Sequence, residues 1–200
     1  MSCYPGRPRV TCVSPEAEQA LLKVSRRQLC DAIRVMVRCG FRPGEFVKLT
    51  AAHVRDLGDR MEFVLSAAEV KTRRARTVRL ADPEVMELVR RVVKLNPKGP
   101  VFRSVDDKPW LVKNLSRSFF RAMKRATKRH GAKFDADCVL YSLRHTYAKR
   151  ILCGFWTKGK AVSVEVLAQL MGNSPAICRQ NYLQWSESYE QPLWDAVAVA

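Results

Sequence analysis

Long apolar stretches, acidic residues and aromatic residues are all scarce in this chain of 200 residues. No run approaches the roughly 18 consecutive apolar residues that a membrane-spanning helix needs, so no such helix is expected. Aromatic residues make up 8% of the chain, which is too thin a spread for the base-stacking platform of many RNA-binding proteins. The basic N-terminus lacks the apolar stretch of a secretory signal, and we expect the protein to stay in the cytoplasm.

The cysteine pattern excludes two further classes of site. The seven cysteines are an odd number without a C-x-x-C pair, and no histidine stands at zinc-like spacing from them. Most fall inside apolar stretches, where a free thiol behaves as a small buried hydrophobic group in a reducing compartment. We therefore predict neither a disulfide framework nor a metal or other cofactor.

Positive charge is what the chain has in excess. Its 36 Lys and Arg against 19 Asp and Glu give a formal net charge of +17 at pH 7. An excess of this size sets up a positive potential over much of the surface, which favours a polyanionic partner. With no membrane segment expected, the partner that fits best is nucleic acid.

Length and periodicity predict one mainly helical domain. Ser14-Pro15-Glu16 is typical of a helix start. Apolar residues at three- and four-residue steps from Leu29 to Val37 predict a second helix that stops near Cys39-Gly40. A helical stretch is expected from about Glu45 to His53. The runs MEFVLS and RTVRL predict a small hairpin-like sheet, and PEVMELVRRVVKL predicts another helix.

A long basic helix is predicted from Leu111 to His130. Leu115, Phe119 and Met123 form an apolar stripe, and basic residues follow a second stripe at the same spacing. Such a stripe is either a solvated charged face or a surface that contacts phosphates, and the pattern leaves both readings open. The predicted DNA-contacting residues are those of this stripe and of the basic segment after MEFVLS: Lys113, Arg117, Arg121, Lys124 and Lys128, with Arg73, Arg74 and Arg76.

Four segments carry the chemistry. The first is CGFRPGEFVKL at residues 39–49, and the second is Lys71 between the two predicted strands. The third is YSLRHTYA at residues 141–148, and the fourth is LMGNSPAICRQNY at residues 170–182. Each is a weak signal alone. In their order and spacing, they resemble the catalytic domain of tyrosine recombinases of the phage integrase family, from about Ser14 to the end of the chain.

The resemblance implies a fold and a mode of action. The fold is α+β, mainly α-helical with a small antiparallel β-sheet. Residues 14–200 would form the catalytic domain and residues 1–13 a lead-in or linker, with the N-terminal core-binding domain of complete recombinases absent. The partner would be double-stranded DNA, bound by a homotetramer on paired sites, while a monomer without DNA is left open.

The resemblance also assigns roles to individual residues. Arg42 and Arg144 would clamp the phosphate being cut, because the planar guanidinium gives paired hydrogen bonds to phosphate oxygens and keeps its proton. Tyr182 would attack phosphorus and hold the DNA end as a 3′-phosphotyrosyl ester, without a metal ion. Lys71 would protonate the departing oxygen, and Glu45 would be structural.

Two positions depart from the family pattern. Tyr141 and Asn173 stand where members usually carry histidine, and neither is an acid or base near neutral pH. Both can still donate a hydrogen bond to a phosphate oxygen, so we count them as assisting catalytic residues and expect reduced rather than abolished activity. His145 follows Arg144 and would point about 100° away from it on a helix, so we predict a structural role.

Three alternatives to a site-specific recombinase remain. The first is a DNA-binding or regulatory module on the same fold, in which the two replaced histidines mark lost chemistry. The second is a DNA-relaxing enzyme similar to type IB topoisomerases, which would lack site preference. The third is a basic RNA-binding protein, which would explain the charge and leave the four segments unexplained.

Overall fold

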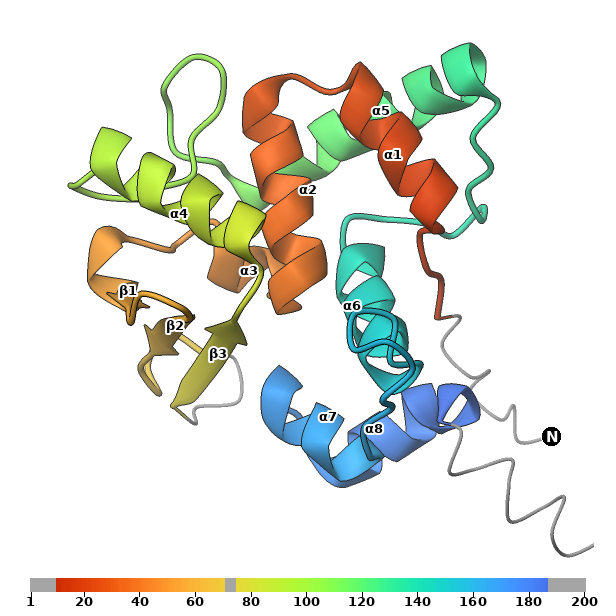
Figure 1. The fold of residues 1–200 in the computed structure, drawn as a ribbon. Coiled ribbons are helices and arrows are strands. Elements are labelled where there is room, and N and C mark those ends of the chain that lie inside the picture. Colours follow the sequence, from red (N-terminus) through yellow and green to blue (C-terminus); the bar gives the residue numbers. More distant parts are fainter. Residues whose placement is uncertain (1–9, 71–74, 187–200) are drawn as a thin grey trace, which may run out of the picture.

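The computed structural model describes residues 10–70 and 75–186. In that part of the chain there are eight α-helices, two short 3₁₀ helices and one small sheet, which lies at one edge of the fold (Figure 1). No helix in these ranges is long and apolar enough to cross a membrane. The helices are α1 (Pro15–Val24), α2 (Arg27–Cys39), α3 (Pro43–Phe46), α4 (Pro83–Leu95), α5 (Val112–His130), α6 (Ser142–Leu152), α7 (Val164–Met171) and α8 (Pro175–Tyr182), with η1 (Ala51–His53) and η2 (Leu183–Trp185).

Local signals set many helix boundaries. The side chains of Ser14, Asp82, Ser163 and Ser174 each accept a hydrogen bond from a backbone N–H of the first turn of α1, α4, α7 and α8. Helices α2, α5 and α7 each end at a glycine in the left-handed region. The predicted start of α1, the predicted end of α2 and the predicted extents of α4 and α5 are confirmed to within a few residues.

The sheet has three antiparallel strands in the order β1-β2-β3: β1 (Val54–Asp56), β2 (Met61–Leu65) and β3 (Arg76–Leu80). The pairing of β2 with β3 confirms the predicted hairpin-like sheet, and the register joins Phe63 to Val78. Strand β1 was not predicted. The helix expected from about Glu45 to His53 is wrong over its middle, because α3 ends at Phe46 and η1 begins only at Ala51.

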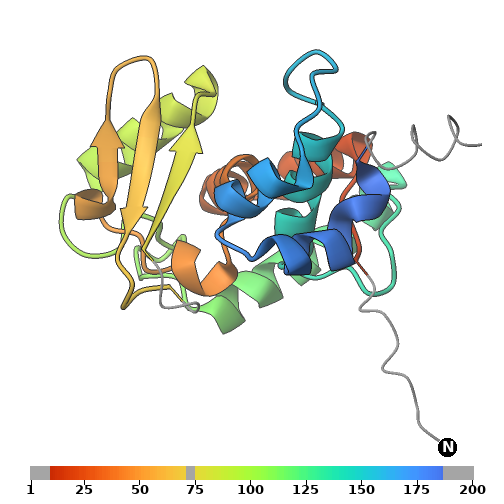
Figure 2. The same ribbon diagram turned by 90° about the horizontal axis from the view of Figure 1, so that it is seen from below.

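Helix α2 lies at the centre of the fold. It packs against α1, α4, α5 and α6 and against strand β3, and it is buried along most of its length. Figures 1 and 2 show the sheet and α4 on one side of α2, with α6, α7 and α8 on the other. Two apolar cores follow from this layout, a large one around α2 and a smaller one that joins α6, α7 and α8.

Candidate active site

Arg42 is placed by the turn at the end of α2. Gly40 ends that helix with φ +62°, and a Cβ there would stand 2.4 Å from the ring of Tyr147, so only glycine fits without displacement. The chain then runs through Arg42 into α3, where the Glu45 carboxylate accepts hydrogen bonds from the Arg42 backbone N–H at 3.0 Å and from Nη1 at 2.7 Å. These bonds fix the guanidinium at the start of α3.

Arg144 lies in the first turn of α6 and is completely buried. Its Nη1 donates to the carbonyl of Gly40, and its Nη2 donates to the carbonyl of Met171 at 2.8 Å. Within the described ranges its Nε–H has no hydrogen-bond partner. Burial, followed by the positive charge of Arg42, lowers the pKa of the Arg144 guanidinium.

Asn173 joins the two arginines. Its Oδ1 accepts a hydrogen bond from Nη2 of Arg42 at 2.7 Å and another from Nη2 of Arg144 at 3.2 Å. The turn that places it depends on Gly172, whose φ is +61° and whose Cβ, if present, would lie 2.6 Å from Cδ of Arg76. The amide oxygen of Asn173 thus lies 131 positions from Arg42 and 29 from Arg144 in the sequence and bonds both.

Arg76 joins this cluster through Glu45 and the end of α7. Its Nη1 bonds Oε2 of Glu45 at 2.8 Å, its Nη2 bonds the carbonyl of Leu170 at 3.2 Å, and its side chain is 2% exposed. Burial, followed by the charge of Arg144, lowers the pKa of Arg76 to about 10. Burial alone would raise the pKa of Glu45, but the charge of Arg76 and the bonds to Arg42 bring it below its ordinary value.

The placement of Arg76 bears on one prediction. It was grouped with Arg73 and Arg74 as a DNA contact, but its guanidinium donates to Glu45 and to the carbonyl of Leu170, and its largely buried side chain borders the hollow described below. The alternation of β3 explains this, because Arg76 and Val78 point into the protein while Thr77 and Arg79 are more exposed. Lys71, Arg73 and Arg74 lie outside the described residues.

Tyr182, the last residue of α8, is 2% exposed. Its hydroxyl lies 2.9 Å from Nδ1 of His145, and its ring stacks on Trp185 with centroids 5.8 Å apart. Burial raises the pKa of Tyr182, and the charge of Arg144 opposes that rise. No hydrogen bond joins its hydroxyl to Arg42 or Arg144 in the described part of the chain, so the phenol is held beside the arginines rather than between them.

His145 makes a contact with Tyr182 that the sequence did not predict. It follows Arg144 on α6, and its Nδ1 contacts the hydroxyl of Tyr182 on α8. Its ring also meets Tyr141 edge-on, with centroids 5.0 Å apart. Burial, followed by the charge of Arg144, lowers the pKa of His145 to about 4, so its imidazole is neutral at pH 7.

An open hollow of about 930 Å³ lies over the cluster. Arg42 and Asn173 line it with Tyr141, which is 37% exposed, and with residues of β3, α7 and α8. The structure therefore brings four of the predicted catalytic residues, Arg42, Arg144, Tyr141 and Asn173, to one place, with Tyr182 behind them. In the described ranges, no group of three or more His, Cys, Asp or Glu side chains could hold a metal ion.

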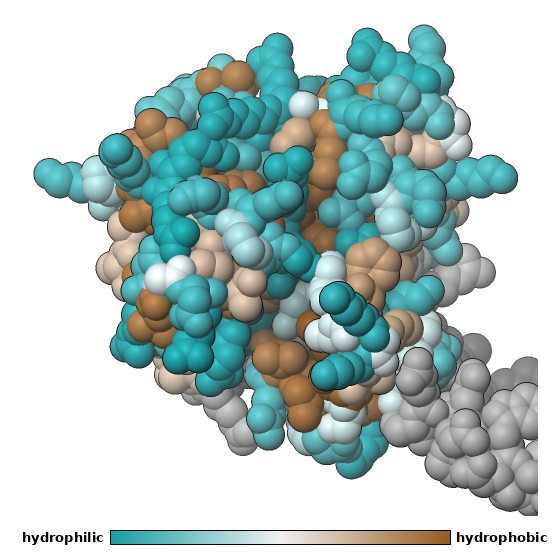
Figure 3. Space-filling model, viewed as in Figure 1, coloured by the Kyte–Doolittle hydropathy of each residue, from teal (hydrophilic) through white to brown (hydrophobic). Residues whose placement is uncertain are grey.

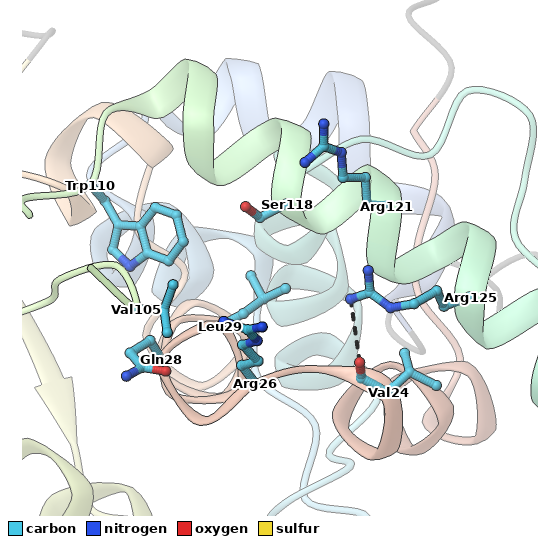
Figure 4. Close-up of a pocket in the computed structure, with 9 residues that line it drawn as sticks. All are labelled: Val24, Arg26, Gln28, Leu29, Val105, Trp110, Ser118, Arg121 and Arg125. Carbon is cyan, nitrogen blue, oxygen red and sulfur yellow. Dashed lines mark hydrogen bonds between the residues drawn. The ribbon is translucent and has the colours of Figure 1, made fainter. Parts of the chain in front are cut away.

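The basic stripe of α5 is exposed, while Leu115, Phe119 and Met123 on its other face are buried. Arg121 also borders a second hollow of about 430 Å³ between α5, the start of α2 and the segment around Trp110. Figure 4 shows the Arg121 guanidinium turned outward, whereas Arg125 reaches back to the carbonyl of Val24. Hydrophilic side chains cover most of the face seen in Figure 3, with smaller apolar areas between them.

Comparison with known proteins places this geometry in a family. The model of the phage integrase family matches residues 13–185. No curated protein matches the sequence.

Solved structures share the fold at low sequence identity. The Tn1549 transposon integrase in complex with a circular intermediate DNA superposes with a TM-score of 0.74 at 16% identity, covering 96% of this chain and 67% of that one. XerA recombinase gives 0.67 at 16% identity, covering 99% and 67%. A lambda integrase dimer bound to a core site gives 0.62 at 18% identity, covering 99% and 54%. The chain thus spans about two thirds or less of these relatives.

Proposed function

Because the chain belongs to the phage integrase family of tyrosine recombinases, we propose that it cuts and rejoins DNA strands at specific sites through a 3′-phosphotyrosyl intermediate at Tyr182, without a metal ion. The observation that carries the proposal is the convergence of Arg42 and Arg144 on Oδ1 of Asn173, at the edge of an open hollow. Two guanidinium groups aimed at one oxygen suit a phosphate, whose oxygens are stronger acceptors than an amide.

The arginines have hydrogen-bonding capacity left for that phosphate. Arg42 donates through Nη1 and Nη2 to Glu45 and Asn173, and its Nε–H makes no bond to the described residues. The Nε–H of Arg144 is buried and unpartnered. A buried donor without a partner is costly in a folded protein. An anion in the hollow would meet Arg42, which lines it, whereas Arg144 is fully buried and acts from beneath the lining residues.

Cleavage then follows as an in-line displacement at phosphorus. The Tyr182 oxygen forms a bond to phosphorus, the bond to the 5′ oxygen breaks, and the two arginines stabilise the charge that grows on the non-bridging oxygens. Lys71 would give the departing oxygen its proton. Rejoining is the reverse reaction, with a DNA 5′-hydroxyl as the attacking group, so the bond energy is kept and no nucleotide cofactor is needed.

The partner proposed is double-stranded DNA, held by the exposed stripe of α5 together with Arg73 and Arg74, by a homotetramer on paired sites. The stripe consists of Lys113, Arg117, Arg121, Lys124 and Lys128, all exposed. Each phosphate that such residues neutralise releases counterions, so binding should weaken steeply as salt rises.

A second candidate is a DNA-binding module that has lost strand cleavage. The burial of Tyr182 and the raised pKa of its hydroxyl favour this reading, since a withdrawn neutral phenol is a poor nucleophile. In that case α5 carries the function, and the arginine cluster only holds the fold together.

Covalent trapping separates the two. The protein is incubated with a pool of nicked duplexes that includes the DNA flanking its own gene, and detergent-resistant protein–DNA adducts are detected on a gel. The wild type and Tyr189→Phe, which alters a second C-terminal tyrosine, should form an adduct, and Tyr182→Phe should not while binding DNA equally well. Salt-sensitive binding with no adduct from any of the three would establish the DNA-binding module.

A further inference from the structure

The Tyr182 hydroxyl has one polar neighbour in the described part of the chain, Nδ1 of His145 at 2.9 Å. The two rings lie with centroids 5.7 Å apart and are tilted by 57°. His145 follows Arg144 on α6, so helix α6 fixes the imidazole beside the arginine clamp, while α8 carries the phenol. A ring nitrogen within hydrogen-bond distance of the proposed nucleophile, on the residue that follows Arg144, is more than a packing contact requires.

We propose that His145 is a catalytic residue of strand cleavage, which accepts the phenol proton of Tyr182 as the tyrosine oxygen attacks phosphorus. This inference rests on the function proposed above. The O–H bond of Tyr182 breaks and its proton moves to Nδ1, while the electron pair of that bond forms the new bond to phosphorus. The bond to the 5′ oxygen breaks, and that oxygen takes a proton from the general acid, assigned above to Lys71.

The charges around the imidazole suit an acceptor. Tyr141 and Arg144 face it from the start of α6 and Tyr182 faces it from α8, and none of these is a carboxylate that would hold it protonated. Burial and the charge of Arg144 lower the pKa of His145 to about 4, so the ring is neutral above pH 5 and free to accept a proton. A weak base suffices here, because the phenol oxygen becomes far more acidic as its bond to phosphorus forms.

Other acceptors near the clamp are committed elsewhere. Glu45 bonds Arg42 and Arg76, and the bridging amide oxygen of Asn173 takes two guanidinium donors. An amide also cannot hold a transferred proton near neutral pH. His145 is thus the base that the geometry offers to Tyr182.

The first test needs no DNA. The proposal requires neutral His145 to carry its proton on Nε2, so that Nδ1 accepts from the tyrosine hydroxyl. Nitrogen NMR of the histidines, with the His145 signals identified by their loss in His145→Asn, reports which nitrogen is protonated. A shift of the Nδ1 signal in Tyr182→Phe is also expected. A proton on Nδ1 at pH 7 would make His145 the donor and overturn the proposal.

The second test measures the rate of adduct formation on the duplex found by covalent trapping. In His145→Asn the amide stands about where Nδ1 was and can accept a hydrogen bond but cannot take the proton. General-base catalysis of this kind is worth at least about 100-fold, so His145→Asn and His145→Ala should both slow the adduct by about that factor, with DNA affinity and thermal unfolding near wild type. The control is His130→Asn, which alters an exposed histidine at the end of α5 and should cleave at the wild-type rate.

The outcomes distinguish failure of the proposed recombinase function from failure of the role of His145. If wild-type protein forms no adduct, the proposed recombinase function fails and this step fails with it. If wild type forms the adduct and His145→Asn forms it equally fast, the contact serves only to position the phenol, and the role of His145 alone is refuted.

Discussion

Replacing Glu45 with alanine should cost far more stability than the loss of a surface ion pair, because this buried carboxylate bonds two guanidinium groups from different segments. It bonds Arg76 at 2.8 Å, with side-chain exposures of 2% and 3%, and it also bonds the backbone and side chain of Arg42. Removing one partner of a buried ion pair costs about 3–5 kcal/mol, since the other charge stays buried and unpaired. At this chain length that is a drop in Tm of roughly 6–20 °C.

Urea unfolding of a set of variants checks this figure. Arg76→Met should cost less than Glu45→Ala, because Glu45 keeps its bonds to Arg42 when Arg76 is gone. The double variant should cost less than the two single losses added together, which measures the coupling between the two residues. The control is Glu165→Ala, which breaks a pair with Arg179 whose side chains are 48% and 56% exposed, and it should leave the urea midpoint close to wild type.

The dependence of stability on pH gives a second check on the role of Glu45. The pKa of Glu45 is lowered in the folded protein, so its contribution is complete above the ordinary value of 4.5 and is lost as pH falls through the lower folded pKa. Glu45→Gln should therefore lose part of the wild-type dependence of stability on pH below 4.5. A cost of Glu45→Ala no larger than that of Glu165→Ala would refute the view that the arginine cluster is built on this carboxylate.

Three further predictions concern the turn, the histidine and the bridging amide. Gly172→Ala should lose at least about 1–2 kcal/mol in urea unfolding, because φ is +61° and the added Cβ meets Arg76 at 2.6 Å, whereas Gly44→Ala, with open space around it, should be near neutral. Between pH 6.5 and about 4, wild type should lose about 1–3 kcal/mol more stability than His145→Asn, because the unfolded histidine binds a proton before the folded one does. If stability fell equally with pH in the two proteins, the lowered pKa of His145 would be contradicted. Asn173→Asp should unfold at the same or a higher urea concentration, because a carboxylate between two guanidinium groups strengthens the cluster. It should also slow adduct formation at least about tenfold, because the carboxylate repels phosphate. Cleavage at the wild-type rate would argue against a phosphate at that point.

The sequence predicted well where structure depends on neighbouring residues. Ser14 caps α1, Gly40 ends α2, and the apolar period of PEVMELVRRVVKL gives α4 from its first residue to its last. It was less successful after α3, where backbone N–H groups of Val47 and Lys48 bond carbonyls three or four residues back and the helix then stops. No breaker residue marks that stop, because it is set by burial of Phe46 and Leu49 in the main core.

The site residues could likewise be predicted from the sequence only in part. Order and spacing along the chain were enough to select Arg42, Arg144 and Asn173, which the structure brings together. They could not show that Arg76 is a buried support, because four basic residues within six positions look alike until the strand alternation is known.

The role of His145 depended on a contact between separate helices. Helix geometry predicts that it points about 100° away from Arg144, but which element it contacts depends on the packing of α8 against α7 and α6. The partner, Tyr182, is 37 residues away in sequence. A pattern confined to one helix therefore predicts the direction of a side chain and leaves its partner open.

The charge balance of the cluster links its stability to the ligand proposed for it. Arg42, Arg76 and Arg144 lie together over one carboxylate in the described part of the chain, and burial together with their mutual repulsion lowers the pKa of Arg76 and of Arg144. Oδ1 of Asn173 is the acceptor on which two of the guanidinium groups converge, but as a neutral amide it adds no negative charge to the cluster. A phosphate oxygen at that point would supply the missing negative charge, so the energy stored as repulsion in the free protein becomes binding energy for DNA. A cluster arranged in this way is less stable alone than it would be with a second carboxylate, and that cost is what makes it selective for an anion.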